Sequence, residues 1–388
     1  MKKLSKDKWK IPLYKVNNDV REIEAISKVI KRGMDWAIGS EIEQFEKKLA
    51  KYIGTKYSVA FNSGTSAGHA ALLSYNLGKN DEIIVPSFSF IATANWPLMV
   101  NSIPKFVDIE NTTFGMDPNK IEESITKKTK AIIPVHYAGL PCKINEIKKI
   151  AKKHNLLLIE DAAESIGAHI NKKKVGTFGD MGIFSFAGNK ILTSGEGGAV
   201  VTNSKKQYEK LKLIRSHGRK TTGNYFSNVN APTYLELGFN WRMSSITAAL
   251  ALSQLNKIEK LIQSRRKHVS QYHKNLKKLN GIKFHSEPKD FMHVYQLFNI
   301  QLPSKKIRNN LMEFLAKKGI MSKVFFEPIH SSYHFKKYRL KHKNLIVTKQ
   351  ISDTILSLPM YPDLTKTEIN KITDFIIQFM EKYNESLN

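Results

Sequence analysis

The most informative segment of this 388-residue sequence is Leu156-Leu157-Leu158-Ile159-Glu160-Asp161-Ala162-Ala163-Glu164. Its apolar first half predicts a strand, Leu156–Glu160, that is buried on both faces, as the strands of parallel sheets are. Segments of helix length, such as Ser66–Leu77 and Asn145–His154, separate several other short runs of the same kind. Strands that alternate with helices predict an α/β domain with a mainly parallel sheet covered by helices on both faces. The other expected strands are Tyr57–Phe61, Glu82–Pro86, Ile103–Val107, Ala131–Val135, Met181–Phe186 and Gly198–Thr202.

The chain outside these strands is mostly helical in its pattern. Apolar spacing from Asp19 to Tyr52 predicts two helices joined by a loop, and helical patterning also dominates from Met243 to Leu279. A mixed region follows, with a β-like run at Val294–Gln301 and helical runs at 306–318 and 366–383. We therefore expect an N-terminal arm over residues 1–20, a large α/β domain over 21–255 and a smaller C-terminal α+β domain over 256–388.

The charge is strongly positive, since 62 Lys and Arg residues oppose 34 Asp and Glu residues and give a formal net charge of +28. Lysine supplies 53 of the basic residues and arginine nine, and they are spread over the whole chain. Nucleic-acid-binding proteins cluster such residues and use arginine for base edges and phosphates. We expect no nucleic-acid partner, and we interpret the excess as surface lysine or as attraction for an anionic partner.

The single cysteine, Cys142, excludes an intrachain disulfide and the zinc patterns that need paired cysteines. No apolar segment follows the lysine-rich N-terminus, and the stretch Phe88–Val100 is too short to span a bilayer. The sequence therefore predicts a cytoplasmic protein that is not embedded in a membrane.

Polar residues follow several of the expected strands, and ligands bind at the carboxyl ends of strands in open α/β sheets. Asn62-Ser63-Gly64-Thr65-Ser66 precedes an apolar helix and is either a capped helix start or an anion cradle. The carboxylates of the Glu160–Glu164 segment either cap a helix or face a positive ligand atom.

A third segment places Lys190 between a β-rich run and a Gly-rich turn, within residues 184–198. A lysine among apolar and small residues loses solvation, and its neutral amine can attack a carbonyl. The alternative is an ordinary surface lysine in a loop. A fourth segment, Leu237–Met243, carries Asn240 and Arg242 in apolar surroundings and is a weak motif alone.

Taken together, these segments suit pyridoxal phosphate. This cofactor needs an anion cradle, a lysine for its aldehyde, a carboxylate for its pyridine nitrogen and an aromatic face for its ring.

The chain resembles the DegT/StrS sugar aminotransferases over roughly residues 11–383, with closest similarity to their perosamine synthase group. The motifs that carry the resemblance are Asn-Ser-Gly-Thr at 62–65, Pro-Ser-Phe-Ser-Phe-Ile-Ala-Thr-Ala-Asn at 86–95, Glu-Asp-Ala-Ala-Glu at 160–164, the 184–198 run and Gly-Phe-Asn-Trp-Arg-Met-Ser at 238–244. The resemblance implies the type I aminotransferase fold and a pyridoxal phosphate-dependent enzyme.

It also implies a role for each matching residue. Lys190 binds the cofactor aldehyde and moves the proton, Asp161 pairs with the pyridine nitrogen, and Glu164 lies near the phenolic oxygen. Phe90 stacks on the ring. Asn240 reaches the cofactor phosphate from a neighbouring subunit, so the resemblance implies a homodimer with a shared active site. The phosphate cup comprises Gly64, Thr65, Ser66 and Ser185. The residues assigned to the substrate are Arg242, Phe326 and His330.

Two positions depart from the common pattern of the family, Ala187 and Ser194, and both changes are small. A branch of the family that removes a hydroxyl has histidine in place of the lysine, so Lys190 favours transamination. The perosamine synthase group, which the runs 324–330 and 358–362 also resemble, aminates the 4-keto carbon of a GDP-linked 6-deoxy sugar with L-glutamate as donor. The same motifs occur in relatives that act on UDP- or dTDP-linked 3- or 4-keto sugars, and those substrates stay open.

His330 and His334 are four residues apart, but no third ligand is evident, so no metal site is expected. A cofactor-binding regulator on the same fold, without turnover, is the alternative to an enzyme, because an intact Lys190 does not prove turnover.

Overall fold

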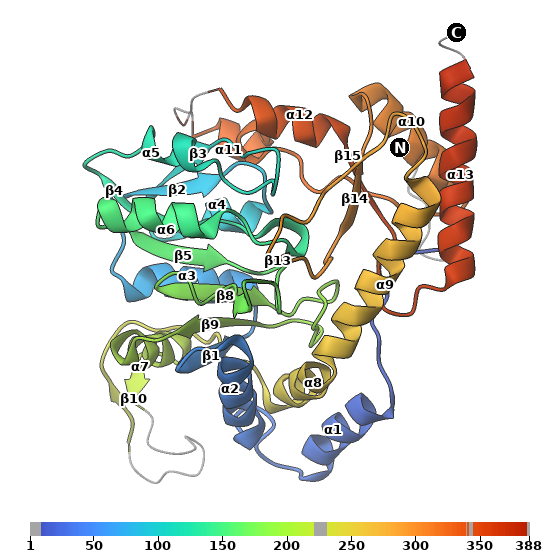
Figure 1. Cartoon of the computed structure of the whole chain (residues 1–388). Helices are drawn as coiled ribbons and strands as arrows, with labels where there is room; N and C mark the ends of the chain where they lie inside the picture. Colours follow the sequence, from blue (N-terminus) through green and yellow to red (C-terminus); the bar gives the residue numbers. More distant parts are fainter. Residues whose placement is uncertain (1–8, 221–230, 339, 341–343, 386–388) are drawn as a thin grey trace.

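A seven-stranded sheet forms the centre of the protein, in the strand order β1-β9-β8-β5-β4-β2-β3 (Figure 1). The computed structural model describes residues 9–220, 231–338, 340 and 344–385. Only β9 of this sheet runs antiparallel to its neighbours, and the other strands are mutually parallel. The strands are β1 (Tyr57–Phe61), β2 (Glu82–Pro86), β3 (Ile103–Val107), β4 (Thr129–Ile132), β5 (Leu157–Asp161), β8 (Met181–Ser185) and β9 (Gly198–Thr202). The predicted mainly parallel sheet is thus confirmed.

Successive strand residues pack on opposite faces of the sheet, as the two-residue period of a strand requires. Val59, Ile83 and Ile159 belong to the apolar cluster that contains residues of α3 (Gly64–Ser74), α4 (Ile91–Met99) and α7 (Lys205–Arg215). Their sequence neighbours belong to clusters with α2 (Ser40–Ile53) and α8 (Ser245–Asn256), or with α6 (Ile144–Lys153). Helices therefore cover both faces, which explains the apolar strand sequences.

The helices α3 and α4 approach each other closely near the carboxyl end of the sheet. A Cβ atom on Gly68 would lie 2.0 Å from Cε2 of Trp96, so no larger residue fits there without rearrangement. The indole Nε1 of Trp96 donates to the carbonyl oxygen of Thr65 at 2.9 Å. This contact fixes the first turn of α3 against α4.

A second, smaller sheet lies in the C-terminal part of the chain. It comprises β12 (Lys283–Phe284), β14 (Phe298–Gln301) and β15 (Ile355–Leu358), and it shares an apolar cluster with α9 (Ile258–Leu276), α10 (Lys305–Lys317) and α13 (Lys366–Glu385). Ile11 belongs to the same cluster and pairs with Ile320, so the described part of the expected arm packs on C-terminal residues. Residues 1–8 of that arm lie outside the described part of the chain. The domain boundaries at 20/21 and 255/256 stay predictions.

The remaining elements are short or peripheral. They are α1 (Val20–Lys31), α5 (Pro118–Glu122), α11 (Tyr333–Lys336), α12 (Ile346–Thr354), β6 (His169–Ile170), β7 (Lys173–Lys174), β10 (Arg219–Lys220), β11 (Thr233–Tyr234) and β13 (Phe291–Met292), with 3₁₀ turns at Tyr137–Gly139 and Ile329–Ser331. None of the helices in the described ranges combines the length and the apolarity that a membrane span needs.

Two strand predictions were wrong in their limits. Of the run Ala131–Val135, only Ala131 and Ile132 belong to a strand, β4 (Thr129–Ile132). Pro134 has no N–H group to continue the hydrogen bonds of the ladder. The run Val294–Gln301 is a strand only from Phe298, and Tyr295 has a φ of 51°, which breaks the extended conformation.

Candidate active site

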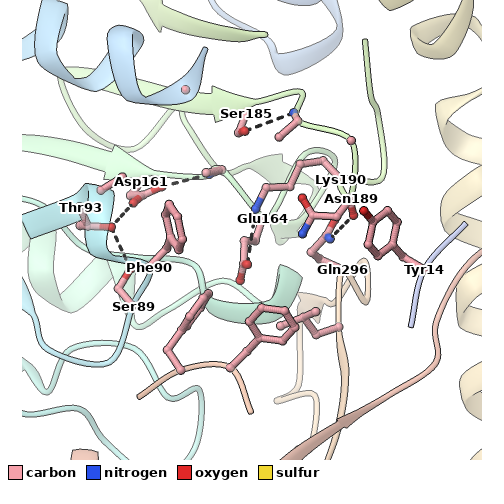
Figure 2. A pocket seen from close by; sticks show the side chains of 18 of the residues that line it. Tyr14, Ser89, Phe90, Thr93, Asp161, Glu164, Ser185, Asn189, Lys190 and Gln296 are labelled. Carbon is pink, nitrogen blue, oxygen red and sulfur yellow. Dashed lines mark hydrogen bonds and ion pairs between the residues drawn. The ribbon is translucent and has the colours of Figure 1, made fainter. Parts of the chain in front are cut away.

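A cavity of about 690 Å³ lies at the carboxyl ends of β1, β2, β5 and β8 (Figure 2). This volume is typical of sites for small organic ligands. Because these four strands are parallel, the residues that follow them meet at one edge of the sheet. The residues of the sequence prediction that line the cavity are Gly64, Thr65, Phe90, Asp161, Glu164, Ser185, Lys190 and Phe326.

Asp161 is the last residue of β5 and carries a buried carboxylate. Its Oδ2 accepts a hydrogen bond from the Thr93 hydroxyl at 2.7 Å, and its Oδ1 accepts one from the Ala163 N–H at 3.1 Å. The Ser89 and Thr93 hydroxyl oxygens lie 2.8 Å apart in turn. Burial raises the pKa of Asp161, while the hydrogen bonds and the charge of Lys190 act in the opposite direction. A cationic group bound beside Asp161 would therefore be strongly stabilised.

Glu160, one residue earlier, is turned away from the cavity. Its two carboxylate oxygens accept hydrogen bonds at 2.7 Å from the N–H groups of three residues in the loop after β7, and Nε2 of His136 lies 3.0 Å away. The three residues are Gly176, Phe178 and Gly179. The sequence left open whether these acids cap a helix or face a positive ligand atom. In the structure, Glu160 binds backbone N–H groups of a loop, and Asp161 lines the cavity.

The substitution Glu160→Gln tests this division. An amide nitrogen would replace one of the two oxygens and face a backbone N–H, so we expect unfolding free energy to fall by about 3 kcal/mol. Chemical denaturation measures this change. An unchanged midpoint would show that the loop 176–179 does not depend on the carboxylate.

Lys190 and Glu164 face each other inside the cavity (Figure 2). The Lys190 Nζ lies 3.5 Å from Oε1 of Glu164, and only 14% and 10% of the two side chains are exposed. The other oxygen of Glu164 accepts a hydrogen bond from the Ala138 N–H at 2.9 Å. The surface-lysine alternative is therefore wrong, since the amine lies in the cavity beside an anchored carboxylate.

The start of α3 and the end of β8 meet at one side of the cavity. The Ser63 hydroxyl caps α3 and accepts from the Ser66 N–H at 3.1 Å. A Cβ atom on Gly64 would lie 3.0 Å from Cβ of Ser185, so the glycine lets the two segments approach. The amides of a helix start and a serine hydroxyl attract an anion. Ser66 is outside the lining residues, and its role in the phosphate cup stays a prediction.

Phe90 and Phe326 are among the aromatic residues that line the cavity. Phe90 precedes α4 and is 58% exposed, which is unusual for so large an apolar side chain beside a core. Its ring centroid lies 6.2 Å from that of Phe326, at a tilted angle. An open aromatic face at this position can stack on a planar ligand.

Besides Ser66, three predicted residues do not line the cavity of their own chain: Asn240, Arg242 and His330. Asn240 is exposed and pairs with Ser216. Arg242 donates to the Ser216 hydroxyl at 3.2 Å. His330 lies behind the cavity wall, where its Nδ1 is 2.7 Å from the Ser87 hydroxyl. Within the described ranges, no group of three metal-ligating side chains occurs.

Sequence reasoning missed Thr93 and Gln296, which both line the cavity. Thr93 lies four residues after Ser89, a spacing that puts both hydroxyls on one side of a helix start, and this was the available signal. Gln296 is a polar residue inside an apolar run and is only 4% exposed, and such a residue needs hydrogen-bond partners.

Comparisons with known proteins agree with this geometry. Residues 17–377 match the model of the DegT/DnrJ/EryC1/StrS aminotransferase family. The chain is 34% identical over 369 residues to a GDP-perosamine synthase of Escherichia coli O157:H7, covering 95% of this chain and 98% of that protein. An aminotransferase structure of the same family from Brucella abortus has a TM-score of 0.85, 32% identity and coverage of 93% and 95%. The structure of PseC of Helicobacter pylori, an aminotransferase involved in the biosynthesis of pseudoaminic acid, has a TM-score of 0.89 and 29% sequence identity. The match covers 96% of this chain and 99% of that one.

Proposed function

Because the chain belongs to the DegT/DnrJ/EryC1/StrS aminotransferase family, with its type I fold, we propose that it transfers the amino group of L-glutamate to the 4-keto carbon of a GDP-linked 6-deoxy sugar. The family assignment makes the protein a pyridoxal phosphate-dependent sugar aminotransferase. The 34% identity to a GDP-perosamine synthase over nearly the whole chain supports the finer choice of sugar and nucleotide. UDP- and dTDP-linked keto sugars are the competing substrates.

The residues of the cavity fit pyridoxal phosphate. The Lys190 amine suits the aldehyde, and the buried Asp161 carboxylate suits a protonated ring nitrogen. The Ser185 hydroxyl and the amides at the start of α3 suit the phosphate, and the exposed face of Phe90 suits the ring. Each part of the cofactor thus has a partner of matching charge or polarity.

When bound, the cofactor supplies an aldehyde that takes up an amino group and a ring that withdraws electrons from the carbon losing a proton. Lys190 holds the cofactor in the absence of an amino donor and, once free, carries the proton from the α-carbon of glutamate. Asp161 keeps a proton on the ring nitrogen, because an adjacent carboxylate favours the cationic form. Glu164 lies beside the Lys190 Nζ and orients the amine through their ion pair.

We also include a homodimer with shared active sites in this proposal. Asn240 is exposed in its own chain and outside the cavity, so it is available to the site of a second subunit. Large apolar side chains on α1 and the following loop are also exposed, including Ile23 at 61%, Met34 at 63% and Trp36 at 47%. Contiguous exposed apolar patches are typical of protein interfaces, and these side chains are the candidates for such a patch.

The test is amine transfer to a panel of GDP-, UDP- and dTDP-linked 4-keto-6-deoxy sugars with L-glutamate as donor. We expect aminated product and 2-oxoglutarate in equal amounts, with the highest kcat/KM for the GDP-linked sugar. A preference for UDP or dTDP would overturn the nucleotide assignment and leave the family assignment intact. Glutamate alone should remove the visible absorbance of the lysine-bound cofactor, whereas a regulator without turnover would retain it.

A further inference from the structure

Gln296, within the segment Val294–Leu297, lies beside Asn189 and Lys190 (Figure 2). The side-chain amide of Gln296 bonds to both peptide groups that flank the lysine. Its Oε1 accepts from the Ile191 N–H at 2.9 Å, and its Nε2 donates to the carbonyl oxygen of Asn189 at 2.7 Å. One side chain therefore fixes the backbone immediately before and immediately after Lys190.

Gln296 itself is held firmly by its surroundings. Nη1 of Arg265, on α9, donates to the carbonyl oxygens of Tyr295, Gln296 and Met360 at 3.0, 3.3 and 3.2 Å. Arg265 is 2% exposed, and burial lowers its pKa to about 10, so it stays charged at neutral pH. Gly139 packs from the other side, where a Cβ atom would lie 2.9 Å from the backbone nitrogen of Gln296.

Glu164, the ion-pair partner of Lys190, is connected by hydrogen bonds to the same segment, Val294–Leu297. Glu164 accepts from the Ala138 N–H, and the Ala138 carbonyl oxygen accepts from the Leu297 N–H at 3.2 Å. The Gly139 carbonyl oxygen accepts from the Val294 N–H at 2.9 Å. The lysine and its carboxylate thus share one support, which sets their relative position.

The residues just before Lys190 are held less firmly than those after it, since Ile191 and Leu192 are buried in an apolar cluster. Residues 187–190 are half-buried, and the glycines 188, 195 and 197 in the loop supply no side chains for packing. The Lys190 N–H donates to the Ala187 carbonyl oxygen at 2.9 Å, a bond within the loop itself. A flexible loop would let the amine leave the position from which it attacks.

We propose that Gln296 is a positioning residue that holds Lys190 for attack on the cofactor aldehyde. The inference rests on the proposed role of Lys190 as the cofactor-binding residue. Gln296 need not contact the cofactor, because it acts on the backbone of residues 189 and 191. In enzymes generally, a displacement of a reacting group by about 1 Å can lower the rate by a factor of about 100. Loss of the Gln296 hydrogen bonds would displace the Lys190 amine in this way.

The test compares Gln296→Leu with Gln254→Leu. Gln254 is a matched control, since it is 1% exposed and donates to the Asn17 carbonyl oxygen at 2.9 Å and to Glu22 at 3.1 Å, away from the cavity. Both variants lose the hydrogen bonds of a buried glutamine. The first readout is attachment of pyridoxal phosphate to Lys190 in the cofactor-free protein, trapped with borohydride and located by peptide mass spectrometry. The second readout is the split between kcat and KM.

We expect Gln296→Leu to slow attachment at Lys190 by about 10-fold or more and to lower kcat by about 10- to 100-fold, with KM for the sugar within about 3-fold. Gln254→Leu should lower the melting temperature but attach the cofactor at the wild-type rate. A second variant, Gln296→Asn, keeps an amide but is one methylene too short to span both peptide groups, so it should also slow attachment.

Three outcomes would overturn the inference. The first is a wild-type rate of cofactor attachment in both Gln296 variants. The second is an equal loss of attachment rate and kcat in the Gln254 control. The third is an effect of Gln296→Leu that is confined to KM. Failure of the underlying function is a separate result, because in that case the wild-type protein itself carries no pyridoxal phosphate on Lys190.

Discussion

Replacement of Lys190 by alanine should abolish amine transfer, lowering kcat by about 10⁴-fold or more. The expected loss is large because the same amine both binds the cofactor aldehyde and moves the proton. The neighbouring Glu164, the ion-pair partner of Lys190, cannot replace the amine as a nucleophile toward an aldehyde. The visible absorbance of the purified protein should disappear as well. Absorbance spectra and steady-state assays with the sugar that the wild-type protein prefers measure both effects.

The control for this variant uses the proposed shared site. A Lys190→Ala subunit retains its own Asn240, and an Asn240→Ala subunit retains its own Lys190, so a mixed dimer contains one complete site if Asn240 acts across the interface. On the proposed role of Asn240, the Asn240→Ala dimer also has low activity, and mixing the two variants after reversible dissociation should then restore up to about half of the activity per mixed dimer. Recovery would prove that the Lys190→Ala subunit is folded. No recovery, with native-like thermal melting of both variants, would mean that Asn240 does not serve a neighbouring site.

Replacement of Asp161 by asparagine should lower kcat by about 10²- to 10³-fold, similar to the loss of one well-placed electrostatic group in other active sites. A neutral amide cannot stabilise a positive ring nitrogen, although it occupies almost the same volume. The Thr93 hydroxyl can still bond to the amide, so the geometry should change little. Activity close to the wild-type value would remove Asp161 from the proposed mechanism.

The same substitution should stabilise the cofactor-free protein at neutral pH. Burial raises the pKa of Asp161 above its ordinary value, so the folded state binds more protons than the unfolded state between the two pKa values, and stability falls as pH rises through that range. Asparagine removes this penalty. The melting temperature of Asp161→Asn should exceed that of the wild type at pH 7, and the difference should vanish as pH falls to the ordinary pKa of an aspartate.

A second buried aspartate provides the matched control. Asp108 is 7% exposed and lies outside the cavity, where its carboxylate accepts hydrogen bonds from the N–H groups of Ile109, Val347 and Thr348 at 2.8–2.9 Å. Asp108→Asn should therefore lower the melting temperature and leave kcat within about 3-fold of the wild type. If both variants change stability in the same direction, burial of Asp161 is not the cause of the effect.

The sequence predicted the parts of the site that follow strands. The Glu160–Glu164 segment and the start of α3 came from local patterns, because an apolar run followed by small and polar residues predicts a strand end, whereas the role of Ser185 came from the resemblance. Parallel strands then place these ends together without further information. The assignment of Lys190 to the cofactor came from the resemblance as much as from the local pattern.

The sequence did not predict contacts made across the fold. Nothing local distinguishes Glu160, which binds the loop at 176–179, from Asp161, which faces the cavity, because adjacent residues in a strand simply point to opposite sides. Gln296 is separated from Asn189 by 107 residues and from Ile191 by 105, so its partners follow only from tertiary packing. The role of Asn240 across a subunit interface came from the resemblance alone and stays a prediction.

The contacts of Arg265 also bear on when the site can form during synthesis of the protein. Its guanidinium joins the backbone of residues 295 and 296 to that of Met360, which lines the cavity. The sheet residues that surround the cavity all precede residue 203 and therefore leave the ribosome well before Met360. Domains of long chains fold in order as they emerge. The nascent chain can therefore build its sheet first, but the lysine loop acquires its full support only after Met360 has emerged.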